Sequence, residues 1–318
     1  MSCGLSWGFF GSGRFGAACL ELLSAWRPPS WIVTAPPKPA GRGRSLSHTA
    51  VEAFAAAGLP SVPLVRSADA SSDGAVLALG EEFRVDFCFV IDFGQLIREP
   101  LLRQDERVGC LNIHPSMLPE YRGAAPIQRA LMDCRPRTGV TAFKLAPGMD
   151  SGPVLLRREI TISGDDNAET LLERAAAAGT AAFIEHASSQ PMEGWAFEAQ
   201  DGSLATNAPK IRPDEERIDW GRPSGGISGQ VRALAPRPGA WTTVRGRRLR
   251  VLSAAPAPED EAGRAEPGTL CGVIDGGVAV HTGEGCLSLL EVQPEGKRAQ
   301  RALDWWNGLR PAKGERLS

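Results

Sequence analysis

An asparagine and a histidine, Asn112 and His114, stand two residues apart in the run GCLNIHPS, which is apolar enough for a buried strand. Side chains at alternate positions of a strand point to the same face, so these two share one side of a sheet. An aspartate, Asp150, follows in the turn GMDSG after another apolar run. That turn leaves a different apolar strand, from which Asp150 could reach the crevice at the carboxyl end of the first, so we expect the three side chains to form a single group.

An amide, an imidazole and a carboxylate together suit acyl transfer. The amide of Asn112 can donate a hydrogen bond to a developing oxyanion, and the imidazole of His114 can move a proton near neutral pH. The carboxylate of Asp150 can hold the imidazole tautomer and favour its charged form. No serine or cysteine forms a nucleophile elbow with His114, so we expect direct transfer. The alternative is structural, with Asn112 capping a turn and His114 packed in the core.

The elements that must position these residues alternate between apolar runs and helix-like stretches as far as about residue 190. Strands are predicted at 6–10, 31–35, 85–94 and 109–116, and two more within 138–162. Helices are predicted at 14–26, 48–58 and 167–188, the last with Asn167 as its N-cap. This alternation predicts an α/β fold with a doubly wound, Rossmann-like, mostly parallel sheet. Ligands bind at the carboxyl ends of the strands in such sheets.

The pattern changes after the long helix. A polar stretch rich in Gly and Pro indicates a connector, and from about Asp214 onward short strands follow one another closely. Close spacing of short strands predicts a small C-terminal β-barrel, OB-like in size. We therefore expect a catalytic domain over 1–190, a linker over 191–213 and a β-barrel over 214–318.

Three glycines, Gly11, Gly13 and Gly16, follow the first predicted strand in the spacing of a dinucleotide-binding turn. A dinucleotide site also needs an acidic residue at the end of the next strand, where this chain has Thr34, Ala35 and two prolines. The glycines alone leave the question open, because any tight turn from a strand into a closely packed helix needs them.

Composition narrows the class of protein. The 318 residues are 42% hydrophobic and 23% charged, no apolar run approaches the ~20 residues of a membrane span, and the N-terminus lacks the pattern of a secretory signal. Seven cysteines without a C-x-x-C pair, and four scattered histidines, favour reduced thiols over a disulfide framework or a zinc site. We expect a cytoplasmic protein with no bound metal and no membrane contact.

The net charge of −2 gives no global positive field, so any contact with nucleic acid must come from local patches. Two basic patches occur, PPKPAGRGRSL near residue 40 and RGRRLR from Arg245 to Arg250. Prolines and glycines predict an extended loop with little intrinsic order for the first patch. The alternative for both patches is solvated surface.

In the motifs around Asn112, His114 and Asp150, the sequence resembles the 10-formyltetrahydrofolate-dependent formyltransferases. That family shares Asn-x-His-x-Ser-x-Leu-Pro, then Arg-Gly-x-x-Pro, then Asp-x-Gly, and this chain matches with Asn112, His114, Ser116, Leu118, Pro119, Arg122, Gly123, Pro126, Asp150 and Gly152. The resemblance implies that Asn112, His114 and Asp150 are the catalytic residues. It also implies that 10-formyltetrahydrofolate is the formyl donor and that the glycine turn is architecture without NAD.

The resemblance extends over nearly the whole chain and is strongest to the family members that act on methionyl initiator tRNA. This part of the resemblance rests on the basic loop near residue 40, on the segment NAPKIRPDEERIDW, which is similar to the hinge into the C-terminal domain, and on the C-terminal half. A monomer that binds both folate and methionyl initiator tRNA is therefore expected. The alternatives are a formyltransferase acting on another amine, such as a sugar nucleotide or glycinamide ribonucleotide, and a non-catalytic tRNA-binding module.

Two sets of binding residues follow from this resemblance. The folate pocket is expected to involve Val90, Ile91, Phe93, Gly94, Ser116, Met117, Leu118 and Pro119, the last four through backbone contacts with the pterin edge. Contacts with tRNA are expected from Lys38, Arg42, Arg44, Arg245, Arg247, Lys297 and Arg298. Two departures from the family pattern bear on the folate site: the first turn reads GSGRFG, and Asp92 stands where a small residue is common.

Overall fold

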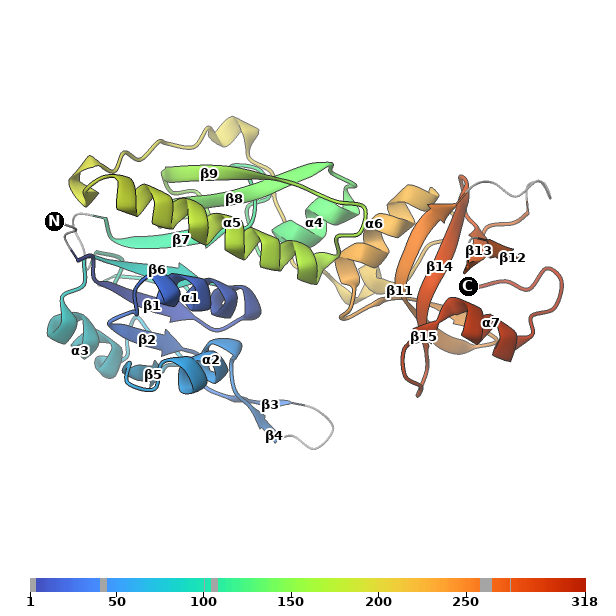
Figure 1. Ribbon diagram of the computed structural model, residues 1–318, viewed down its shortest axis with the longest axis horizontal. Helices are drawn as coiled ribbons and strands as arrows, with labels where there is room; N and C mark the ends of the chain where they lie inside the picture. Colours follow the sequence, from blue (N-terminus) through green and yellow to red (C-terminus); the bar gives the residue numbers. More distant parts are fainter. Residues whose placement is uncertain (1–3, 41–44, 100, 104–107, 258–264, 275) are drawn as a thin grey trace. The chain divides into compact units, whose positions relative to one another are not determined.

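The computed structural model describes residues 4–40, 45–99, 101–103, 108–257, 265–274 and 276–318, which form two compact units (Figure 1). The first unit comprises Met1–Arg122, Thr138–Ile160 and Leu172–Asn207, and the second comprises Gly123–Arg137, Thr161–Leu171 and Ala208–Ser318. The second unit thus includes two short segments that precede the expected linker. The domain bounds drawn from the sequence stay a prediction.

A seven-stranded sheet forms the first unit, in the order β5-β2-β1-β6-β7-β8-β9. The strands from β5 to β7 pair in parallel, and β8 runs antiparallel to β7. The bounds are β1 (Trp7–Gly11), β2 (Trp31–Thr34), β5 (Leu64–Arg66), β6 (Phe87–Ile91), β7 (Cys110–His114), β8 (Arg137–Lys144) and β9 (Val154–Thr161). The predicted mostly parallel sheet is confirmed, with its strand order reversing between β1 and β6.

Helices cover this sheet on both faces. They are α1 (Arg14–Trp26), α2 (Ala50–Gly58), α3 (Gly74–Phe83) and α5 (Ala168–Ser189), and a short η1 helix covers Leu101–Arg103. On one face, Phe89 of β6 meets Phe183 of α5 with ring centroids 4.8 Å apart. On the other face, Val90 packs in a cluster that includes Val76 of α3. Consecutive residues of one strand are thus buried on opposite faces, which explains why these strands read as continuous apolar runs.

The basic stretch near residue 40 begins and ends in a small two-stranded ribbon. Strands β3 (Lys38–Ala40) and β4 (Ser45–Ser47) pair antiparallel, with Lys38 opposite Ser47. The sequence predicted an extended loop with little order, whereas the structure pairs the two ends of this stretch in a β-ladder. The ladder satisfies backbone groups that an extended loop would leave to water.

The second unit is built on an antiparallel sheet in the order β10-β11-β14-β13-β12, with β15 beside β14. Its strands are β10 (Ala240–Val244), β11 (Arg247–Ala257), β12 (Leu270–Ile274), β13 (Gly277–His281), β14 (Cys286–Pro294) and β15 (Gln300–Arg301). Its helices are α4 (Pro126–Met132), α6 (Ser224–Leu234) and α7 (Ala302–Leu309). Val231 of α6 and Trp305 of α7 belong to one core with the inward residues of the sheet. The predicted C-terminal β domain is confirmed.

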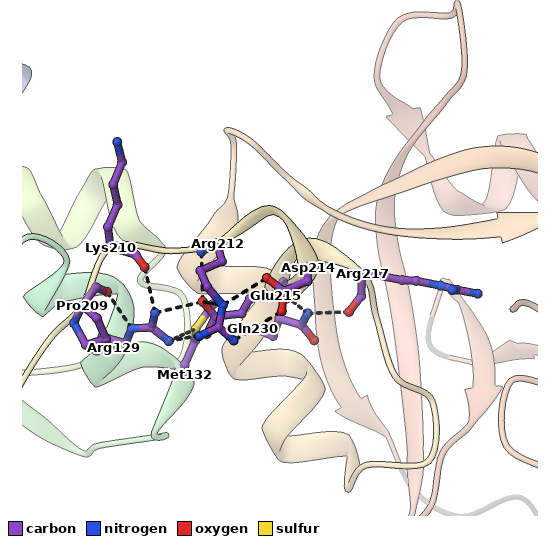
Figure 2. A network of polar contacts seen from close by, with 9 residues as sticks. All are labelled: Arg129, Met132, Pro209, Lys210, Arg212, Asp214, Glu215, Arg217 and Gln230. Atoms are coloured by element: carbon purple, nitrogen blue, oxygen red, sulfur yellow. Dashed lines mark hydrogen bonds and ion pairs between the residues drawn. The ribbon is translucent and has the colours of Figure 1, made fainter.

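The connector between the long helix and the β domain is held by side chains, with three short η helices along it (Met192–Gly194, Gly202–Leu204 and Pro213–Glu216). In the second unit, Arg129 of α4 donates to both carboxylate oxygens of Glu215, at 2.6 and 3.0 Å. Figure 2 shows this pair beside Gln230 of α6, which donates to the carbonyl oxygens of Glu215 and Arg217. Helix α6 packs closely on α4, because a Cβ on Gly229 would lie 2.5 Å from the Leu131 carbonyl oxygen.

Candidate active site

The glycine turn after β1 is filled by a neighbouring aspartate. The carbonyl oxygen of Asp92 accepts the N–H groups of Ser12 and Gly13, and its carboxylate accepts the N–H of Phe15 at 3.2 Å. A Cβ on Gly13 would collide with this carboxylate, and one on Gly16 would lie 2.5 Å from the Ile91 carbonyl oxygen. A bound pyrophosphate needs the N–H groups of such a helix start, and Asp92 takes them. The glycines therefore serve close packing of α1 on β6.

The two central strands separate where the site begins. Strands β6 and β7 pair at Cys88–Cys110 and Phe89–Leu111, and beyond that point β7 pairs with β8, with Asn112 opposite Phe143. The carboxyl ends of β6 and β7 are therefore not joined by the parallel ladder. This places Asn112 and His114 at a strand end near a reversal of strand order, the usual position of ligand sites in such sheets.

His114 is buried, with one ring nitrogen hydrogen-bonded and the other facing a carboxylate. Its side chain is 7% exposed, its Nε2 lies 2.9 Å from the Tyr121 carbonyl oxygen, and its Nδ1 lies 3.6 Å from Oδ2 of Asp150. A carbonyl oxygen only accepts, so Nε2 carries the proton of the neutral ring and Nδ1 is left with a lone pair. The structure thus brings His114 and Asp150 together, at a separation longer than a hydrogen bond but short enough for an ion pair.

Asn112 shares a strand face with His114 and is half-buried. None of the described residues forms a hydrogen bond with its side-chain amide. The amide N–H groups are therefore available to a bound molecule, as an oxyanion donor requires.

The turn carrying Asp150 has a strained but well-defined backbone. Asp150 has a φ of +50°, a left-handed conformation that aspartate and asparagine tolerate better than most residues. A Cβ on Gly152 would collide with the carbonyl oxygen of Lys144, so the glycine is needed for close contact with the end of β8. This explains in physical terms the spacing Asp-x-Gly.

A glutamine that the sequence did not single out ties this turn to Arg122. Gln200 Nε2 donates to the carbonyl oxygens of Asp150 and Gly152, at 2.9 and 2.7 Å. Its Oε1 accepts from Nε and Nη2 of Arg122, at 3.2 and 2.7 Å. Gln200 stands 50 residues after Asp150 in a polar stretch with no periodicity, so no local spacing could have indicated its role.

The segment from Ser116 to Pro119 already uses much of its backbone. Thr141 Oγ1 donates to the Ser116 carbonyl oxygen and accepts from the Leu118 N–H, at 2.7 and 3.0 Å. Arg157 donates to the Leu118 carbonyl oxygen at 2.8 Å, and the Met117 and Pro119 carbonyls also accept backbone N–H groups. These contacts make the segment a rigid wall beside His114. Contact between this backbone and a pterin ring stays a prediction.

The segment at the end of β6, the second part of the expected folate pocket, is mostly buried. Val90, Ile91 and Phe93 are buried, whereas Gly94 is exposed and has a φ of +74°. The first three therefore support the site mainly as core, as the sequence also indicated for apolar strand residues. Direct contact with a folate from this segment stays a prediction.

The predicted RNA-binding cations divide into paired and unpaired side chains. Arg245 binds Glu315 through two contacts of 2.6 and 2.7 Å. Among the described residues, no carboxylate pairs with the exposed Arg247, Lys297 or Arg298. Arg245, Arg247 and Lys297 line one pocket of about 340 Å³ together with Arg248. Lys38 is exposed on β3, and Arg42 and Arg44 lie outside the described residues.

Comparison with known proteins identifies the family. Residues 16–187 match the model of the formyl transferase family, and residues 210–310 match that of the formyl transferase C-terminal domain. The chain belongs to the formyl transferase family. Its curated relatives include the methionyl-tRNA formyltransferase of Anaeromyxobacter sp. (strain K), 38% identical with 95% of this chain and 96% of the relative covered. That of Thiobacillus denitrificans is 36% identical, with 97% and 98% covered.

Solved structures share the fold at low sequence identity. HypX from Aquifex aeolicus in complex with tetrahydrofolic acid superposes with a TM-score of 0.65 at 16% identity, covering 98% of this chain and 48% of HypX. This formyltransferase chain thus spans about half the length of HypX. The sugar 3N-formyl transferase WlaRD superposes with a TM-score of 0.64 at 15% identity, covering 92% of this chain and 99% of WlaRD.

Among the described helices of the chain, none is long and apolar enough to cross a membrane.

Proposed function

We propose that this formyltransferase moves the formyl group of 10-formyltetrahydrofolate to the α-amino group of methionine esterified to initiator tRNA. The observation that carries the proposal is the 35–38% identity to curated methionyl-tRNA formyltransferases over nearly the whole chain. The group formed by Asn112, His114 and Asp150 supplies chemistry that fits this reaction. The expected monomeric state and cytoplasmic location belong to the same proposal.

In the proposed reaction the amino nitrogen attacks the formyl carbon directly, a C–N bond forms, and the bond to N10 of the folate breaks. Asn112 donates a hydrogen bond to the formyl oxygen as negative charge develops there. His114 takes a proton from the attacking nitrogen at Nδ1 and returns it to N10. Asp150 faces that nitrogen at 3.6 Å and stabilises the imidazolium while it exists.

Positioning falls to residues that do not touch the reacting atoms. The Tyr121 carbonyl fixes the His114 ring, so that Nδ1 faces Asp150 in either protonation state. Gln200 holds the Asp150 turn through two backbone carbonyls. A histidine oriented by a backbone acceptor loses less entropy in the transition state than one free to rotate.

Binding of the tRNA is assigned to exposed cations. Arg247, Lys297 and Arg298 are free to meet phosphate, and Lys38 with Arg42 and Arg44 form a second basic segment. Phosphate contacts give affinity without reading the sequence and weaken steeply with salt. Because Arg245 is already paired with Glu315, it serves the RNA only by giving up that carboxylate.

The test is to incubate the protein with 10-formyltetrahydrofolate and charged initiator tRNA, and to measure formylmethionine released by hydrolysis. Charged elongator tRNA, a dTDP-amino sugar and glycinamide ribonucleotide are offered in parallel. We expect rapid formylation of the initiator tRNA alone. Faster formylation of either small amine would assign the chain to another activity in the family, and no formylation with folate bound would favour a non-catalytic module.

A further inference from the structure

Three potential metal ligands from three strands converge in the second unit. They are Cys271 on β12, His281 at the end of β13 and Cys286 at the start of β14, and their ligand atoms all lie within 4.8 Å of one another. Cys286 is buried, and the other two are half-buried. We propose that these three side chains bind a Zn²⁺ ion, with the fourth position held by water.

The local backbone explains why these residues meet. His281 and Cys286 face each other across the β13–β14 ladder, joined by a short turn in which Thr282 Oγ1 donates to the Glu284 and Gly285 carbonyls. Cys271 occupies a bulge between Leu270 and Gly272, where the β12–β13 register shifts. A bulge re-aims the side chain of its extra residue. The following Gly272 has a φ of +135°, which favours glycine.

The distances suit a tetrahedral metal. In a zinc site with Zn–S of ~2.3 Å and Zn–N of ~2.0 Å, sulfur and nitrogen ligands lie about 3.6 Å apart, and two sulfurs lie about 3.8 Å apart. Cys286 Sγ lies 3.6 Å from His281 Nδ1. Cys271 Sγ lies within 4.8 Å of both atoms and donates to the Thr269 carbonyl oxygen at 3.3 Å, a contact that binding of the metal by its thiolate would replace.

The donor set selects the kind of ion. Two thiolates and one imidazole are soft or borderline donors, which suit Zn²⁺ and do not suit Mg²⁺ or Ca²⁺. The supporting backbone is already ordered, because the His281 N–H donates to the Thr269 carbonyl at 2.9 Å and the His281 carbonyl accepts from Gly268. An ion here would join three strands at one end of the sheet. Its role would be to stabilise the fold of this unit, with no part in the reaction at His114.

The experiment is to strip the full-length, reduced protein with a chelator and titrate it with Zn²⁺, measuring bound metal per chain by elemental analysis. Parallel titrations use Mg²⁺, and Co²⁺ as a spectroscopic probe of thiolate ligation. We expect one Zn²⁺ per chain, thiolate-to-Co²⁺ absorption and a higher thermal unfolding midpoint with Zn²⁺ than without it. Mg²⁺ should have no effect.

The variants are Cys271→Ser and His281→Gln, with Cys134→Ser as the matched control because Cys134 is an exposed thiol of the same unit. Each ligand variant should weaken Zn²⁺ binding by at least ~10–100-fold, the loss typical of even a supporting partner of a metal ligand. Their circular dichroism without metal should match that of the unmutated protein, which separates loss of a ligand from loss of the fold.

Three results would overturn the proposal. One is an unmutated protein that binds no stoichiometric Zn²⁺, and another is equal binding by the Cys271→Ser and Cys134→Ser variants. The third is a Cys271–Cys286 disulfide in the non-reduced protein, found by mass spectrometry, whose reduction restores no Zn²⁺ binding. That last result would make the pair a redox-active dithiol.

Discussion

Each unit of the molecule holds a histidine within a group of three polar side chains, and the two groups differ in what surrounds the ring. His114 has one nitrogen tied to a backbone carbonyl and the other facing a carboxylate, whereas His281 faces the thiol of Cys286. The first arrangement fixes a tautomer and suits proton transfer, and the second suits donation of electron pairs to a cation such as Zn²⁺. The Nδ1 atom lies 3.6 Å from its neighbour in both groups. The chemistry therefore depends on whether that neighbour is a carboxylate or a thiol.

A second contrast concerns where polar groups are buried. The first unit keeps His114 and Asp150 largely covered and Asn112 half-buried, while the second unit exposes Arg247, Lys297 and Arg298 and holds a half-buried ion pair between Arg129 and Glu215. We infer that polar groups of the first unit act on the reaction, and that those of the second unit hold structure or meet RNA. Substitutions in the two units should then change different measured quantities.

The largest effect is expected in the first unit. Asn112→Ala, His114→Ala and Asp150→Asn should each lower kcat by on the order of 10²–10³, the usual loss for one transition-state donor, while folate affinity stays unchanged. Asp150→Asn is preferred to alanine because asparagine tolerates the φ of +50°. Single-turnover formylation of charged initiator tRNA measures the loss, with His186→Gln as the control histidine of the same unit.

The double variant of His114 and Asp150 sharpens this result. If the two act as one unit, it should be hardly slower than His114→Ala alone. Near-native turnover in any two of the single variants would remove the assigned roles. Strictly multiplicative losses in the double variant would show that Asp150 acts independently of the ring.

The next effect concerns stability in the second unit. Hydrogen bonds from Arg129 lower the pKa of Glu215 to about 2, so the charged form is favoured in the folded state. The resulting stability is present above the unfolded pKa near 4.5 and is lost as the pH falls toward 2. Glu215→Gln should lower the free energy of unfolding at pH 7 by about 2 kcal/mol, allowing for partial solvent exposure.

Thermal unfolding at several pH values between 3 and 7 measures this contribution. The difference between the unmutated protein and Glu215→Gln should narrow as the pH falls. Asp214→Asn, an exposed carboxylate of the same short helix, should change little at any pH. A gap that stays constant over this range would mean that the ion pair with Arg129 is not the source of the stability.

A smaller effect is expected from Gln200, which acts through the Asp150 turn without touching the reaction. Gln200→Leu removes both contacts to the turn, and we expect kcat to fall about tenfold, equivalent to about 1.4 kcal/mol. KM for the folate should stay the same, and Gln200→Glu, which keeps an acceptor for Arg122 but cannot donate to the two carbonyls, should be as slow as Gln200→Leu. A fall in stability with unchanged kcat would make Gln200 merely structural.

The smallest effect per residue belongs to the exposed cations. Replacing Arg247, Lys297 and Arg298 together by glutamine should raise KM for charged tRNA several-fold and leave kcat unchanged. Each lost phosphate contact should reduce the slope of log affinity against log salt by about 0.7–0.9. Arg158→Gln, an exposed cation paired with Glu185 in the first unit, is the control. An unchanged salt slope would return these residues to ordinary solvated surface.

The sequence by itself determined the alternation of strands and helices, the pairing of Asn112 with His114 on one strand face, and the turn that carries Asp150. These features are local: side-chain direction follows from a period of two, and turns follow from glycine and aspartate. The strand β5 and the helices α3, α4, α6 and α7 were not predicted. None of these helices exceeds 11 residues, a length at which an isolated helix is marginal in water and packing supplies the stability.

Only the tertiary structure decided which distant groups complete the sites. The Tyr121 carbonyl at Nε2 and the Gln200 amide at the Asp150 turn reach their partners through folding of separate segments. Asp92 fills the glycine turn from 79 positions after Gly13. The meeting of Cys271 with His281 depends on a register shift that no spacing in the sequence encodes. Local backbone geometry can be inferred from neighbouring residues, whereas contacts across strands depend on register and on the packing of the whole unit.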